Sequence, residues 1–173
     1  MIQSTQTVPQ LSSAVIPAVR GEFYSYSAQF TLDTPLYCML KCKANKSRPV
    51  GECDLLAGEV DLVFVFGDDG LRMCSADSQF AAPLIGRIKP AMRNPTWISP
   101  TNLSNPAFEQ FRERRDGRFL AGYCNAQAQS AQAVTLMWGA IYAIKTRSGK
   151  YGLIRVTEIT ASSVCIDACH ILL

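Results

Sequence analysis

The chain has 173 residues, which is enough for one domain with a substantial apolar core and short for two. Hydrophobic residues make up 48% of it, which excludes global disorder, and no apolar run approaches the roughly 20 residues that span a bilayer. The net charge of +3 is too small to indicate nucleic-acid binding, so we expect neither a membrane span nor a nucleic-acid partner.

Residues 1–20 lack the basic segment and continuous apolar segment of a signal peptide, and their polar composition predicts a flexible N-terminal tail. Residues 21–173 are expected to form a single β-rich domain. Without a signal peptide we expect cytoplasmic protein with reduced thiols. The alternative is a secreted or periplasmic protein from which a signal peptide has been removed.

The first predicted strand is residues 23–32, "FYSYSAQFTL", where aromatic and aliphatic side chains alternate with Ser, Gln and Thr. This period of two indicates a strand with one buried face. The segment 36–43 favours a further short strand. Residues 43–52, "KANKSRPVGE", have the composition of an exposed turn.

A hairpin is predicted at residues 60–76. The segment "VDLVFVF" is apolar at nearly every position, which is typical of a strand covered on both faces. The following "GDDG" supplies residues that tolerate a tight turn, and "LRMCSA" returns as the second strand.

Residues 86–106 contain four prolines, which predict an extended loop without a long helix or a central strand. One short helix is expected at about 105–116. Asn105 is a candidate cap, Pro106 suits the first turn, and Gly117 is a candidate stop signal.

The C-terminal third predicts a three-stranded antiparallel meander. Strands are expected at 134–146, 151–159 and 164–173, with short turns between them, after a loop or weak helix at 124–133. The whole pattern predicts a mainly β fold, an antiparallel sandwich or partly closed barrel. In general shape these hairpins resemble the β domains of uncharacterised bacterial proteins, a likeness that implies no function.

Seven cysteines and one histidine are the candidates for metal or thiol chemistry. If 164–173 is a strand, Cys165 and Cys169 share a face but stand roughly 13 Å apart, too far to bind one ion. His170 then points to the opposite face, among apolar neighbours. The favoured interpretation is thiols packed as small core residues; the alternative is a composite site assembled across strands from Cys38, Cys42, Cys53, Cys165, Cys169 and His170.

The sequence offers little support for catalysis. It contains no phosphate-binding glycine motif and no Gly-x-Ser-x-Gly motif, so we expect no cofactor. Any Ser–His or Cys–His pair would have to use His170, which we interpret as a structural core histidine.

Charge is distributed unevenly, with a net charge of −6 over residues 52–86 and +4 over residues 87–118. These segments can steer a charged partner or cancel one another in the fold. We expect a non-catalytic binding module that uses the Pro-rich loop and the basic end of the helix. Its partner would be a protein or a small anionic ligand, and the candidate contact residues are Trp97, Arg112, Arg115 and Arg118.

Overall fold

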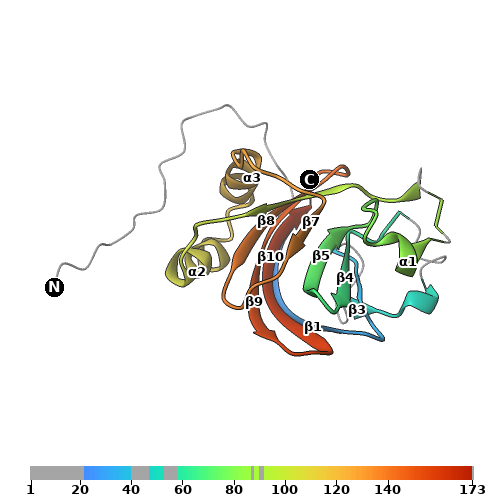
Figure 1. Ribbon diagram of the computed structural model, residues 1–173. Helices are drawn as coiled ribbons and strands as arrows, with labels where there is room; N and C mark the ends of the chain where they lie inside the picture. The colour runs from blue at the N-terminus through green and yellow to red at the C-terminus, as the bar shows by residue number, and fades with distance from the viewer. Residues whose placement is uncertain (1–21, 40–46, 53–57, 87, 90–91, 173) are drawn as a thin grey trace.

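A computed structural model describes residues 22–39, 47–52, 58–86, 88–89 and 92–172. The predicted tail at 1–20 and the candidate ligands Cys42 and Cys53 lie outside these residues. Two five-stranded antiparallel sheets dominate the fold, which confirms the mainly β prediction (Figure 1). In the described part of the chain, no helix is both long and apolar enough to cross a membrane.

The first sheet contains both ends of the described chain. Its strand order is β1 (Phe23–Thr31), β10 (Ser163–Leu172), β9 (Lys150–Ile159), β8 (Ile141–Thr146) and β6 (Thr96–Pro100). Strands β8, β9 and β10 form the predicted meander. Ser25 and Ser27 of β1 lie on one face and Phe30 lies on the other, as the period of two predicts.

The second sheet has the order β3 (Ser47–Arg48), β2 (Leu36–Tyr37), β4 (Leu62–Gly67), β5 (Gly70–Ser75) and β7 (Ala133–Thr135). Strands β4 and β5 are the predicted hairpin, paired from Leu62–Ser75 to Gly67–Gly70. Gly70 has a φ of 108°, a conformation that favours glycine because it has no Cβ.

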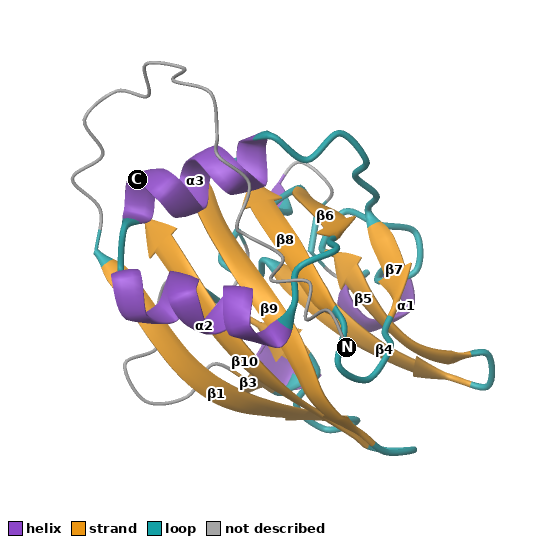
Figure 2. Ribbon diagram, turned by 90° about the vertical axis from the view of Figure 1, so that its left-hand side faces the viewer, coloured by secondary structure: helices purple, strands orange, loops and turns teal. Residues whose placement is uncertain are grey.

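The sheets and helices are arranged in layers. Helices α2 (Asn105–Arg114) and α3 (Gly117–Asn125) cover one face of the first sheet, and the second sheet packs on its other face (Figures 1 and 2). The remaining helices are short: α1 (Ala82–Ile85) packs on the second sheet, and a 3₁₀ turn, η1, spans Val50–Glu52.

Three apolar clusters occupy the spaces that these layers create. The central cluster lies between the sheets and includes Phe30, Phe64 and Ile154. A second cluster lies between the helices and the first sheet, and a third lies on the outer face of the second sheet. Burial of apolar surface on both faces of each sheet is the main stabilising contribution to such a fold.

Two details of the predicted helix were wrong. The N-cap is Ser104, whose Oγ accepts a hydrogen bond from the backbone N–H of Ala107 at 3.4 Å, and not Asn105. Gly117 does not end the helical region. Arg115 adopts a left-handed φ of 50°, Asp116 caps the next turn, and Gly117 begins α3.

Two predictions on the strands also need correction. The Pro-rich segment contains a strand, β6, but it lies at the edge of its sheet, where Pro100 removes no central hydrogen bond. The single strand predicted at 134–146 is two strands in different sheets. Gly139, with a φ of 75°, lies in the turn between β7 and β8.

Candidate functional site

The strand β10 separates the C-terminal cysteines from the histidine. Cys169 is buried between the sheet and the helices, and Cys165 lies half-buried on the same face. His170 faces the second sheet, where its ring stacks on Tyr24 at 5.1 Å between centroids and meets the edge of Tyr26 at 5.5 Å. Cys38 is buried in the cluster on the outer face of the second sheet.

Four of the described cysteines, Cys74, Cys124, Cys165 and Cys169, lie in environments that disfavour the thiolate. Burial raises the pKa of both Cys169 and Cys124 to about 12. Within the described ranges, no three His, Cys, Asp or Glu side chains are placed to hold one metal ion. The composite site therefore stays a prediction that depends on Cys42 and Cys53.

The predicted arginine group is divided by the fold. Arg112 is half-buried and bound within the protein: its Nε donates to Ser25 Oγ at 3.0 Å, and its Nη1 lies 3.3 Å from a carboxylate oxygen of Glu109. Arg155 completes this network with contacts of 2.7 Å to Glu109 and 2.6 Å to Asp167. These ion pairs fasten α2 to the outer face of the first sheet.

The other two arginines, Arg115 and Arg118, are both exposed. Arg115 donates to the backbone carbonyl of Phe23 at 3.0 Å, and its guanidinium lies over the Phe23 ring. Arg118 is exposed in the first turn of α3. The basic helix end thus provides mainly contacts within the protein.

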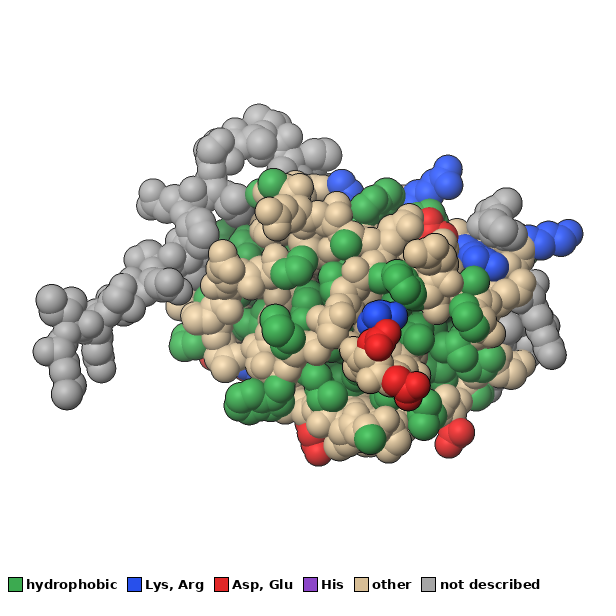
Figure 3. Space-filling view, viewed as in Figure 1, with side chains coloured by type: hydrophobic (Ala, Val, Ile, Leu, Met, Phe, Trp, Pro, Cys, Tyr) green, Lys and Arg blue, Asp and Glu red, His purple; other side chains and the backbone are tan. Residues whose placement is uncertain are grey.

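One face of the molecule shows no dominant charged surface. In the space-filling view, apolar side chains are spread between small groups of acidic and basic ones (Figure 3). Among the described residues, the most exposed large apolar side chain is that of Trp138, at 76%. Trp138 lies in the turn between β7 and β8, where its indole N–H donates to the carbonyl of Thr157 at 2.9 Å.

Trp97 lies in a groove between the end of α3 and strands β6 and β8. The groove has a volume of about 240 Å³, and the Trp97 indole is 39% exposed. Trp97 and Lys145 are opposite one another on β6 and β8, so their side chains project from the same face of the sheet. We call this the Trp97 groove; it is lined by Trp97, Ser99, Cys124, Asn125, Gln127, Ser130, Ala143, Ile144 and Lys145.

The polar groups of the Trp97 groove include the amino group of Lys145, whose hydrogen-bond partner is neutral. Lys145 Nζ donates to the neutral amide oxygen of Asn125 at 2.7 Å and lies 5.8 Å from the centre of the Tyr151 ring. No carboxylate among the described residues lies within ion-pair distance of Lys145. Gln127 is fixed by a hydrogen bond from its amide nitrogen to the carbonyl of Tyr123.

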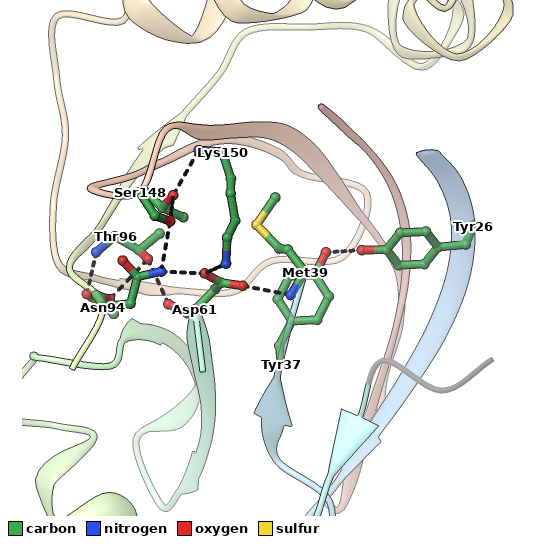
Figure 4. Close-up of polar contacts among 10 residues, drawn as sticks. Tyr26, Tyr37, Met39, Asp61, Asn94, Thr96, Ser148 and Lys150 are labelled. Carbon is green, nitrogen blue, oxygen red and sulfur yellow. Dashed lines mark hydrogen bonds and ion pairs between the residues drawn. The ribbon is translucent and has the colours of Figure 1, made fainter. Parts of the chain in front are cut away.

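A second polar cluster is buried between the two sheets (Figure 4). Asp61 Oδ1 accepts from Lys150 Nζ and from Asn94 Nδ2, each at 2.6 Å, and Asp61 Oδ2 accepts from the backbone N–H of Met39 at 2.7 Å. Thr96 Oγ1 donates to the backbone carbonyl of Asp61 at 2.8 Å. Burial raises the pKa of the Asp61 carboxyl, against the opposing effect of Lys150 and these hydrogen bonds.

The sequence prediction identified Trp97 but missed its partners and the buried cluster. Lys145 could have been noticed as the one charged residue in the otherwise apolar "GAIYAIKT" segment. Asn125 is the last residue of α3, which was not predicted, and Gln127 and Ser130 follow that helix. Asp61, Asn94 and Lys150 are far apart in sequence, and no local pattern connects them.

The comparisons with known proteins bear on the fold alone. No protein-family model matches the sequence, and no curated protein sequence matches it. The chain is similar in structure to a DUF4466 family protein from Parabacteroides merdae, with a TM-score of 0.55 and 12% sequence identity. The similarity covers 87% of this chain and 53% of that protein, so the chain spans about half the length of this structural neighbour.

Proposed function

We propose that the protein is a non-catalytic binding module whose ligand lies in the Trp97 groove. The observation that carries this proposal is the position of Lys145, a cation with a neutral amide as its hydrogen-bond partner, directly beside a partly exposed indole. A concave surface with an aromatic ring and a few convergent polar groups is the usual form of a small-molecule site.

The chemistry of the groove favours a small ring compound that carries a carboxylate and hydroxyl groups. The carboxylate would pair with Lys145, and the C–H face of the ring would lie on Trp97. Hydroxyl groups would exchange hydrogen bonds with Asn125, Gln127 and Ser130, which supply both donors and acceptors. A volume of about 240 Å³ suits one sugar-sized ring.

Arg112 and Arg115 are less suited than Lys145 to bind a ligand carboxylate. Arg112 already has carboxylate partners, and Arg115 is bound to a backbone carbonyl. A ligand carboxylate at Arg112 would have to replace Glu109, whereas among the described residues Lys145 has no carboxylate within ion-pair distance that a ligand would have to displace.

Tryptophan fluorescence can test this proposal because the chain has two tryptophans, of which Trp97 lies in the groove and Trp138 does not. In a Trp138→Phe variant, the emission reports Trp97 alone. We expect a saturable change on titration with glucuronate, with weak affinity because the probe is small. Added salt should weaken glucuronate binding, since the Lys145 contact is electrostatic.

Matched variants separate the two contacts of the groove. A Lys145→Met change should abolish the preference for glucuronate over glucose, which lacks the carboxylate. A Trp97→Ala change should abolish binding of both, measured by calorimetry. Equal glucuronate binding by the protein and by its Trp97→Ala variant would refute the groove as the site, and so would a complete lack of saturation.

A further inference from the structure

The buried cluster holds a lysine amine, an asparagine amide and a carboxylic acid in mutual contact. Lys150 Nζ and Asn94 Nδ2 each lie 2.6 Å from the same oxygen, Asp61 Oδ1, so the two nitrogens are separated by at most twice that distance (Figure 4). The amine and the amide group of Asn94, whose Cγ is bonded to Nδ2, therefore share one carboxylate oxygen as their partner.

The three side chains come from different parts of the fold and are held in place on all sides. Asp61 directly precedes β4 of the second sheet, Asn94 precedes β6, and Lys150 begins β9. The Lys150 side chain is 3% exposed and that of Asp61 is not exposed at all. Groups fixed in this way react as an intramolecular pair, which removes the entropic cost of their encounter.

The cluster is almost fully buried, which makes separated charges costly there. A buried ion pair loses the hydration of both charges, and transfer of one proton from the ammonium to the carboxylate neutralises both groups. Burial raises the pKa of the Asp61 carboxyl, in agreement with this transfer. A neutral Nζ has the lone pair that a nucleophile requires.

We propose that Lys150 and Asn94 become joined by an intramolecular amide bond, with Asp61 as the proton carrier and ammonia as the leaving group. Nζ gives one proton to Asp61 and attacks Cγ of Asn94, forming the new C–N bond. Asp61 then transfers a further proton from Nζ to Nδ2, the bond between Cγ and Nδ2 breaks, and ammonia departs. Of the three ammonium protons, one stays on the new amide, one leaves with ammonia and one remains on Asp61, so no oxidant or other reactant is needed.

Two neighbours support this chemistry. Ser148 is exposed, and its Oγ lies 3.4 Å from Asn94 Nδ2, which places the leaving nitrogen next to the surface. Pro95 follows Asn94 and has no backbone N–H, so the common loss of ammonia through attack by the next backbone nitrogen is blocked there. Loss of ammonia from Asn94 therefore points to Lys150.

The intact mass of the purified full-length protein tests the proposal. We expect a mass below that of the sequence by one ammonia molecule, after correction for any N-terminal processing. Trypsin should then release a branched peptide that joins residues 94–112 to residues 148–155, with no cleavage after Lys150. Fragmentation of this peptide locates the bond.

Variants identify the role of each group. Lys150→Arg, Asn94→Ala and Asp61→Ala should each retain the full sequence mass, whereas the exposed controls Lys89→Arg and Asn102→Ala should still lose one ammonia. The peptide map of the protein without substitutions decides the question even if a buried variant fails to fold. Separate peptides 94–112 and 151–155 in the folded protein would overturn the proposal. Loss of water in place of ammonia would overturn it as well, because that would mark Asp61 as the acyl donor.

Discussion

Asp61 and Lys150 form a contact of 2.6 Å between Oδ1 and Nζ, although 89 residues separate them in the chain. Asp61 adjoins the second sheet and Lys150 begins a strand of the first sheet, so their contact joins the two layers. Asp61 also accepts hydrogen bonds from Asn94 and from the backbone of Met39. The carboxylate is thus the common acceptor for three segments of the chain.

Replacement of Asp61 by Ala should therefore cost far more than replacement of an exposed acid. Removal of one partner from a buried pair leaves the other polar groups without an acceptor, which costs about 3–5 kcal/mol of unfolding free energy. Urea denaturation measures this loss. Asp69→Ala is the matched control, since its side chain is 83% exposed, and it should change stability by about 0.5 kcal/mol or less. Equal effects of the two changes would contradict the structural role of Asp61.

The ion pairs of Arg155 with Glu109 and Asp167, between α2 and the first sheet, predict a loss of stability at acid pH. Burial of Asp167 alone would raise the pKa of its carboxyl, but hydrogen bonds from Arg155 and Ser27 hold that pKa below its usual value of 3.8. A lowered pKa means that the unfolded chain takes up the proton first, so this contribution is present above pH 3.8 and is lost as the pH falls below it.

An Asp167→Asn variant should lose about 2 kcal/mol near neutral pH, since charge-assisted hydrogen bonds are replaced by weaker ones. Its stability should also depend less on pH in the acid range. Thermal unfolding between pH 3 and pH 7 would measure both effects. An unchanged acid dependence in the variant would show that Asp167 is not the responsible group.

Gly117 should not tolerate a methyl group. A Cβ at this position would lie 1.9 Å from Cδ1 of Ile171, a buried side chain on β10. Gly117→Ala should cost about 1–3 kcal/mol, because the overpacked contact forces α3 or Ile171 to move. At Gly67 an added Cβ would meet its nearest atom at 3.9 Å, so Gly67→Ala is the control and should be tolerated. Chemical denaturation of the two variants provides the comparison.

Buried thiols predict a loss of stability in alkali. The pKa of Cys169 is raised from 9.0 to about 12 by burial, so the unfolded chain releases this proton first. The contribution is fully present below pH 9.0 and is lost as the pH rises toward about 12. A Cys169→Ala variant should lack this loss, which amounts to about 1.4 kcal/mol per pH unit within that range.

The half-buried Cys165 serves as the control for this measurement. Cys165→Ala should change the alkaline slope less than Cys169→Ala, because the Cys165 thiol already contacts solvent. The order of reaction with a thiol reagent provides a separate check. Cys165 should react before Cys169 in the folded protein, and the reverse order would contradict the placement of these residues on β10.

The sequence predicted elements whose signals are local. The period of two in β1 and β10 follows from alternation of side chains across a strand, so the separation of Cys169 from His170 could be derived before any coordinates. Helix α3 was missed because Gly117 is normally a stop signal. Glycine is required at position 117 because Ile171 leaves no room for a Cβ there. These two residues are 54 positions apart, so no local sequence pattern indicates their contact.

The candidate sites depend even more on contacts between residues that are far apart in the sequence. The Trp97 groove combines side chains from β6, β8 and the segment after α3, and the buried cluster combines residues from both layers. Sequence alone placed Trp97 in a loop, whereas its position on β6 opposite Lys145 is what gives the groove a cation. Such sites depend on strand register, which is set by long-range pairing.

Strands β1 and β10 are hydrogen-bonded neighbours from Phe23–Ile171 to Thr31–Ser163, so the first described strand pairs with the last. During synthesis on a ribosome, β1 emerges well before β10, the strand with which it pairs in the described part of the chain. The first sheet can therefore be completed only after β10 has been translated, and the aromatic side chains of β1 remain exposed to solvent until then. Shortening the chain before Ser163 would remove the partner of β1 along with one strand, so we expect truncated products to aggregate rather than to form a smaller fold.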